Sequence, residues 1–273
     1  MLFNGTNTIY NIKLQNAKSI GVTYSILANT TLNEKFGIEV VDSLKPLKEY
    51  PNLNLITLGV NEEFKLSNKA TRLNLTRSRH SPIDAALFNH IPFYLRPLTE
   101  VNDNPPSDSI RLTKVINIQG VDHLAGYGYV LNDIEYKNDI LVYNNVQNDY
   151  VNVSKLDTND ATLLNPIPKS TSELDLANNN TYVTDFLKAY VYMTESELLE
   201  IKNAMDILYT TTPTITEIGV CNSLIKTLEN GKLENYAVQI AYFADVDIDI
   251  NKAIQEKSLE FYIDLGGMDI LVI

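Results

Sequence analysis

The segment from Arg77 to Leu98 constrains the fold more than any other stretch of this 273-residue chain. It reads RSRHSPIDAALFNHIPFYLRPL and combines three prolines, two histidines and a dense apolar cluster. Ser81 is a preferred N-cap residue, Pro82 fits the first helical position, and the negative charge of Asp84 suits a first turn. The next proline ends such a helix, because it lacks an N–H and its ring clashes with the preceding turn. The pattern predicts a short, buried helix near 81–91 that runs into an extended stretch.

A second helix is indicated after residue 193. Thr194 and Glu197 have the spacing of a capping box, in which each residue's side chain bonds the backbone of the other. The apolar residues that follow share one helical face at spacings of three and four: Leu198, Ile201, Met205 and Leu208. The sequence therefore predicts an amphipathic helix near 195–209 that packs on a sheet or on a partner.

Alternation of polar and apolar residues predicts strands through much of the remaining chain. Residues 181–193 follow a period of two throughout, and residues 53–60 form an apolar run bounded by a proline and a glycine. Residues 111–131 read as a hairpin whose turn is the Gln-Gly pair at 119–120. We expect an α+β, sheet-dominated fold with β-sandwich-like sheets and the two helices described above.

A polar stretch at residues 157–180 is the best candidate for a boundary within the chain. It contains two prolines and the run LANNNT, which are typical of loops. We predict an N-terminal β-rich lobe with a short helix over 1–160, a linker or surface excursion over 161–180, and a C-terminal α+β lobe over 181–273.

The charge of the chain limits its partners. The formal net charge of −12 argues against direct nucleic-acid binding, which needs a basic surface. The one local concentration of basic residues is Arg72, Arg77, Arg79 and His80. This concentration is either a contact for an anionic partner or a solvated or interface-paired loop. No apolar run is long enough to span a membrane, and the first residues lack the pattern of a signal peptide.

Three aspartates near the C-terminus form the most tempting metal site. Asp245, Asp247 and Asp249 begin like a calcium loop, and Glu256 falls at its twelfth position. However, Ile250 stands at the sixth position, where the sharp turn needs glycine. The intervening residues alternate as in a strand, which favours three carboxylates on one solvent face and no bound cofactor.

The remaining reactive residues form no recognisable catalytic motif. The three histidines, His80, His90 and His123, lack the local spacing of a zinc pair and have no evident partners. The single cysteine, Cys221, lies in an apolar run and is expected to be a buried structural thiol. No phosphate loop, dinucleotide turn or nucleophile elbow is present. We therefore expect a protein that is not an enzyme.

Several segments together resemble a family of virion structural proteins of tailed bacteriophages. They are HSPIDAALFNHIPFYLRPL (80–98), GVDHLAGYGYVL (120–131), MTESEL (193–198), AMDILY (204–209) and ITEIGVC (215–221). In addition, LITLGVN (55–61), followed by DAALF and LRPL, is similar to baseplate wedge proteins of contractile tails, although the wedge family's aromatic and Arg-Arg-Asp pattern is missing. The resemblance extends over residues 50–250 and implies no active site.

The resemblance implies an assembly subunit of a phage tail or baseplate that bridges neighbouring subunits. Such a protein would be made in the host cytoplasm, reside in the virion, and form a homo-oligomer within a larger assembly of phage structural proteins. The interface candidates are the 101–109 loop and six residues: Arg77, Arg79, His80, Asp245, Asp247 and Asp249. The alternatives are a neck or head-to-tail connector, a metal-dependent hydrolase acting at the three aspartates, and a carbohydrate-binding module that uses tyrosine faces.

Overall fold

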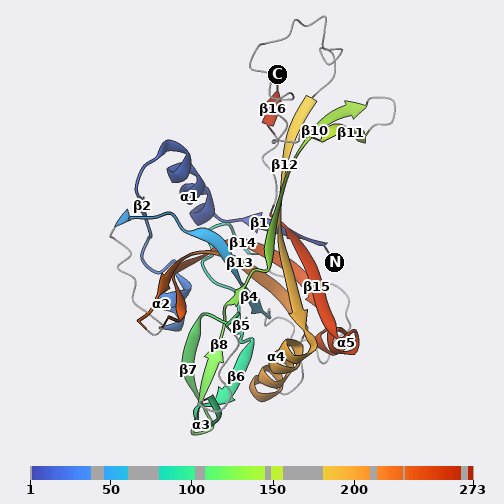
Figure 1. Cartoon of the computed structure of the whole chain (residues 1–273). Helices are drawn as coiled ribbons and strands as arrows, with labels where there is room; N and C mark the ends of the chain where they lie inside the picture. The colour runs from blue at the N-terminus through green and yellow to red at the C-terminus, as the bar shows by residue number, and fades with distance from the viewer. Residues whose placement is uncertain are drawn as a thin grey trace, which may run out of the picture.

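The computed structural model of the chain is a twisted sheet, with α1 and α2 on one side and the other helices at its lower end (Figure 1). It describes residues 2–37, 46–60, 80–101, 108–144, 149–155, 181–209, 214–229, 231–265 and 270–272. The helices are α1 (Ile9–Ile20), α2 (Leu32–Phe36), α3 (Leu98–Val101), α4 (Glu195–Leu208) and α5 (Ile250–Gln255). The strands are β1 (Leu2–Asn7), β2 (Tyr24–Ser25), β3 (Pro46–Leu47), β4 (Asn52–Gly59), β5 (His90–Ile91), β6 (Tyr94–Pro97), β7 (Thr113–Ile118), β8 (Val121–Gly126), β9 (Tyr129–Val130), β10 (Asp133–Asn144), β11 (Asp149–Lys155), β12 (Thr181–Thr194), β13 (Ile215–Thr227), β14 (Leu233–Ile248), β15 (Ser258–Asp264) and β16 (Ile270–Val272).

Most strands belong to one large sheet. Its order is β11-β10-β12-β15-β1-β14-β13-β4-β5, with β16 also pairing with β12 and β9 with β4. The pairing of β1 with β15 is parallel, whereas β1 and β14 are antiparallel. Strands β6, β8 and β7 form a separate small sheet. The prediction of a sheet-dominated α+β fold is therefore confirmed.

The sheet does not divide at the boundary expected from the polar stretch. Residues 156–180 lie outside the described part of the chain, so the predicted linker over 161–180 cannot be placed. The strands on its two sides nevertheless interleave, because β10 pairs with β12, β1 with β14 and β15, and β4 with β13. Residues from both predicted lobes thus build one continuous sheet.

Strands β13 and β14 form the centre of the sheet and are covered on both faces. Every residue from 215 to 224 is buried, which is typical of a strand with apolar layers on either side. One apolar cluster joins these strands to α4, α5, β12 and β15. A second cluster joins them to Leu32 of α2, to Leu87 and to the small sheet. The longest apolar runs of the sequence therefore lie between two packed layers.

Helix α4 confirms the prediction made from the capping box. The Glu197 carboxylate accepts hydrogen bonds from the backbone N–H and the hydroxyl of Thr194, both at 2.8 Å. The helix buries the side chains of Leu198, Ile201, Ala204 and Met205. Burying a large apolar side chain contributes roughly 1.5–3 kcal/mol, so this stripe fixes α4 on the core.

The predicted helix near 81–91 is wrong: residues 81–89 form turns and bends that lead into β5. The backbone groups that a helix would pair internally are bonded elsewhere. The Pro82 carbonyl accepts from the Ile9 N–H at 2.8 Å, and the Leu87 N–H donates to Nε2 of His90 at 3.1 Å. Ile83 is 65% exposed and thus does not lie on a buried helical face. One long-range and one local hydrogen bond thus replace the helical ones, and the extended stretch that follows is present as β6.

The predicted hairpin is present as β7 and β8. Gln119 and Gly120 form its turn with φ angles of 51° and 86°, which a two-residue hairpin turn requires. The return strand ends at Gly126 instead of continuing to residue 131. A Cβ at Gly126 would collide with Cγ2 of Ile110, and one at Gly128 would lie 2.9 Å from Cγ of Leu112. These two glycines allow residues 110–112 to pack closely against the end of the hairpin.

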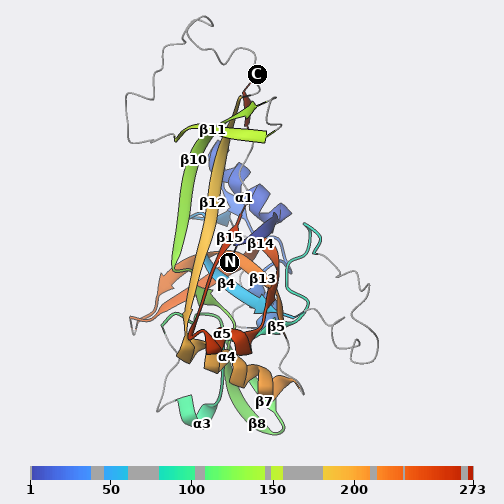
Figure 2. The same ribbon diagram turned by 90° about the vertical axis from the view of Figure 1, so that its right-hand side faces the viewer.

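A β-ribbon, hereafter the arm, projects from the body of the molecule (Figures 1 and 2). Strands β10 and β12 form a long antiparallel ladder, which runs from the Asp133–Tyr190 pair to the Val142–Thr181 pair. Strand β15 pairs with β12 only along Lys188 to Thr194. The arm is the part of this ladder beyond β15, with β11 and β16 on its two sides (136–144, 149–155, 181–187 and 270–272). Within the described residues, no helix has the length and apolar character needed to cross a membrane.

Candidate functional site

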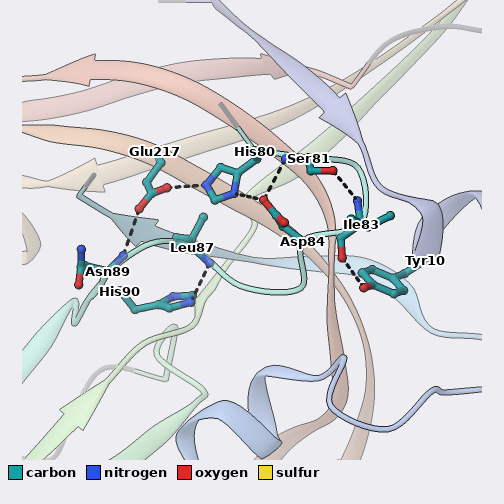
Figure 3. A network of polar contacts seen from close by, with 9 residues as sticks. All are labelled: Tyr10, His80, Ser81, Ile83, Asp84, Leu87, Asn89, His90 and Glu217. Atoms are coloured by element: carbon teal, nitrogen blue, oxygen red, sulfur yellow. Dashed lines mark hydrogen bonds and ion pairs between the residues drawn. The ribbon is translucent and has the colours of Figure 1, made fainter. Parts of the chain in front are cut away.

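His80 lies between two carboxylates on the face of the sheet that residues 80–91 cover (Figure 3). Its Nε2 is 2.5 Å from Oε2 of Glu217, and its Nδ1 is 3.3 Å from Oδ2 of Asp84. The side chains of His80 and Glu217 are 4% and 3% exposed, whereas that of Asp84 is 37% exposed. A buried histidine thus bridges an inner and an outer carboxylate.

Strand β13 and the neighbouring β4 position Glu217. Its backbone lies opposite Gly59, where an added Cβ would come within 2.8 Å of Cγ of Glu217. Glycine therefore leaves the space into which the glutamate side chain folds. Oε1 of Glu217 also accepts from the Asn89 N–H at 3.4 Å, while the Asn89 amide donates to the Val60 carbonyl at 3.1 Å. Glu217 thereby attaches the end of the 80–89 segment to the sheet.

Two phenylalanines enclose the imidazole of His80. The ring of Phe243 is stacked on it, with centroids 3.9 Å apart and planes 8° apart. The ring of Phe88 is tilted, at 4.6 Å and 31°. The two rings therefore shield the imidazole from water.

Asp84 is held by its own turn. Its Oδ2 accepts from the Ser81 N–H at 2.9 Å, and its N–H donates to the Ser81 carbonyl at the same distance. The next contact outward is with α1, where the Tyr10 hydroxyl donates to the Ile83 carbonyl at 2.5 Å. The turn therefore connects α1 to the buried histidine.

The arrangement has the features of a structural ion-pair junction. Both ring nitrogens of His80 can donate to carboxylates only when the ring carries two protons. Among the described residues, no serine, threonine or cysteine is hydrogen-bonded to the imidazole, and Oγ of Ser81 accepts from the Ile83 N–H at 3.5 Å. The expectation that the histidines lack partners is therefore wrong for all three. Nε2 of His90 accepts from the Leu87 N–H, and Nδ1 of His123 lies 2.9 Å from the Val121 carbonyl oxygen.

The three aspartates lie at the end of β14. Asp245 and Asp247 are exposed and alternate with the buried Val246 and Ile248. Asp249 caps α5, with Oδ1 accepting from the N–H groups of Asn251 and Lys252 at 2.9 and 3.3 Å. Within the described part of the chain, no group of three His, Cys, Asp or Glu side chains could hold a metal ion. A strand end and a helix cap account for this acidic pattern.

The other predicted interface residues fall largely outside the described structure. Arg77 and Arg79 lie outside it, as do residues 102–107 of the predicted 101–109 loop. Cys221 is fully buried, as expected for a structural thiol, and burial raises its pKa to about 12. Of the predicted interface residues that the structure describes, His80 alone takes part in this cluster, and its partners there are Asp84 and Glu217.

Sequence patterns do not identify Glu217 and Asp84 as the partners of His80. Glu217 stands alone as an acidic residue within the run ITEIGVC, and a carboxylate in a buried strand needs a charged or hydrogen-bonded partner. That signal indicates that a partner exists but does not identify it. Asp84 was assigned to a helix start, although its four-residue spacing from His80 was visible in the sequence.

Comparison with known proteins gives a family for the chain. Neither the curated proteins nor the solved structures contain a match to it. The model of a family of unknown function (DUF7208) matches residues 4–272, which is nearly the full length. The chain accordingly belongs to this family of unknown function.

Proposed function

We propose that this protein is a non-enzymatic structural subunit of a tailed-phage particle, in its tail or baseplate, that bridges neighbouring subunits. The observation that carries the proposal is the arm, which extends the β10–β12 ladder beyond the rest of the sheet (Figure 2). Strands that project from the body in this way can pack against a neighbouring subunit.

The arm also offers a means of contact. Among the described strands, β11 pairs on one edge only, with β10, so its other edge presents unpaired backbone groups. Such an edge can add a strand from another chain, because main-chain hydrogen bonds form across it in register. This mode of contact needs no catalytic residue, which agrees with the enclosed position of His80.

The phage assignment is supported by the sequence resemblance of residues 50–250. The net charge of −12 supports it further, since like charge keeps free copies apart before assembly. Under this proposal the protein is made in the host cytoplasm, incorporated into the virion, and in contact with other copies and other structural proteins there.

The test has two parts. Mass spectrometry of purified particles should find the chain in a fixed ratio to the other structural proteins, and a density map should locate it. In addition, Asn138 and Asp185 face each other in the ladder, so an Asn-Gly turn can join them in place of residues 139–184. The shortened chain should melt at the temperature of the full chain yet fail to restore particles lacking the gene product.

A chain carrying Glu256→Gln, an exposed change on the body, serves as the matched control and should restore particles fully. Efficient incorporation of the shortened chain would overturn the role of the arm. Absence of the chain from purified particles would overturn the assignment as a virion protein. Location at the neck would favour the head-to-tail alternative.

A further inference from the structure

The open side of the sheet at the base of the arm has an unusual composition. Side chains of β12 alternate, so that Ala189, Val191 and Met193 enter the core while the residues between them face outward. The pairing of β12 with β10 and β15 places eight outward residues on the same side. These residues, hereafter the tyrosine face, are Asp133, Glu135, Lys188, Tyr190, Tyr192, Glu260, Tyr262 and Asp264.

The core lies on the opposite side of these strands. Residues of α4 and α5 pack in one cluster with the inward residues of β12 and β15. On the tyrosine face Tyr192 is 39% exposed and Glu260 is exposed, whereas Tyr190 and Tyr262 are half-buried. The face is thus accessible across two neighbouring strands.

The three tyrosines form a row on neighbouring positions of β12 and β15. Tyr190 and Tyr262 lie opposite each other in the ladder, with ring centroids 5.0 Å apart and planes at 37°. Tyr192 follows Tyr190 two residues along β12, on the same side. Desolvation and the negative charge of Glu260 both raise the pKa of Tyr190, to which Glu260 is also hydrogen-bonded. The row therefore lies in a negative electrostatic environment.

The charges of the face are strongly unbalanced. Four carboxylates (Asp133, Glu135, Glu260 and Asp264) surround the tyrosines, against the single ammonium of Lys188, which leaves a net charge of −3. Lys188 lies opposite both Glu135 and Asp264, whereas Asp133 and Glu260 lie opposite the tyrosines. An anionic ligand would be repelled. Aromatic faces and carboxylates together are the groups that bind ammonium and guanidinium ions.

We infer that the tyrosine face binds a lysine- or arginine-rich segment of another protein. Charge complementarity selects this partner, because a basic segment can pair with the carboxylates while its charged groups lie over the tyrosine rings. That the partner is a neighbouring subunit of a phage particle rests on the proposed function. Binding of a cationic peptide by the purified chain does not rest on it.

The experiment titrates the purified full chain with fluorescent hexa-arginine and follows anisotropy at low and at physiological ionic strength. We expect binding that weakens as salt is added, since the charges are exposed. Tyr192→Thr keeps a strand-forming residue and should weaken binding about two- to fivefold through the lost cation–π contact. Glu260→Gln can still accept a hydrogen bond and should weaken binding to a similar or larger extent.

Two matched controls separate this site from the overall negative charge. Asp247→Asn removes one exposed charge from β14, and Ile225→Thr removes one exposed apolar side chain from β13. Both should leave hexa-arginine affinity unchanged, and melting curves should show that all four variants are folded. If Asp247→Asn weakens binding as much as Glu260→Gln does, the attraction is diffuse and the inference fails.

Two further results would also overturn it. The first is the absence of any hexa-arginine binding at low ionic strength. The second is binding of neutral glycans on an array that is lost in Tyr192→Thr, which would make the face a carbohydrate site. Each of these results concerns the isolated chain, so each is distinct from the absence of the protein in purified particles.

Discussion

Nε2 of His80 lies 2.5 Å from Oε2 of Glu217, although 137 positions separate the two residues in the chain. The contact joins the turn at 80–84 to the central strand β13. Because both side chains are almost fully buried, water cannot take the place of either partner when the other is removed. The stability of this region should therefore depend on the pair.

His80→Gln should destabilise the protein by about 3–5 kcal/mol, because it leaves the Glu217 carboxylate buried without its imidazole partner. The free energy of unfolding from urea titration measures this. Glu256→Gln is the matched change at the surface. Oε1 of Glu256 lies 3.9 Å from Nζ of Lys252, whose side chain is 73% exposed. That change should cost less than about 1 kcal/mol.

Replacing both buried residues, as His80→Leu with Glu217→Leu, should cost less than the two single changes together, since no charge then remains buried in the pair. Equal free energies of unfolding for His80→Gln and Glu256→Gln would show that the junction does not stabilise the fold.

Gly59→Ala should destabilise the folded protein through steric clashes of the added methyl group. Its Cβ would lie 2.8 Å from Cγ of Glu217 and 2.9 Å from the Asn89 carbonyl oxygen. Overpacking of this kind typically costs about 1–3 kcal/mol. In a Glu217→Ala background the side-chain clash is removed, so the added cost of the alanine should fall. An unchanged cost in that background would assign the effect to the Asn89 carbonyl instead.

The thiol of Cys221 should be inert in the native protein. It is fully buried, and burial raises its pKa to about 12, so neither access nor thiolate is available at neutral pH. Because it is the single cysteine of the chain, its reaction with Ellman's reagent reports on opening of β13. The thiol should react at once in denaturant and, in native buffer, only as fast as the core opens. Rapid reaction in native buffer would contradict its position in the core.

Alkaline pH should weaken the packing of Tyr24. Burial raises the pKa of this tyrosine from 10.0 to about 12, and its hydroxyl donates to Oε1 of Gln239 at 2.6 Å. The folded state therefore holds the proton more tightly than the unfolded state. The contribution to stability is complete below pH 10 and is lost as the pH rises toward about 12.

Thermal melting of the wild type and of Tyr24→Phe across this pH range checks the assignment. The variant should lose about 1 kcal/mol at neutral pH through the missing hydrogen bond. It should also show a smaller decline in melting temperature between pH 10 and about 12. Parallel declines in the two proteins would place the alkaline transition elsewhere.

Elements whose sequence signals are local could be predicted before the structure was known. The capping box of Thr194 and Glu197 with the apolar stripe after it specifies α4, because both act within one or two helical turns. Gln119 and Gly120 specify the hairpin of β7 and β8 through their backbone conformation. Alternation along residues 181–193 specifies β12, since a period of two assigns each side chain to a face.

The conformation of residues 80–91 and the order of the sheet depend on contacts between distant parts of the chain. The helix signals of Ser81, Pro82 and Asp84 were real, but each is worth only about 1 kcal/mol. They are outweighed by the burial of Leu87, the hydrogen bond from Ile9 to the Pro82 carbonyl, and the pairing of His80 with Glu217. These contacts join residues that are distant in the chain, and no local pattern encodes which of them meet.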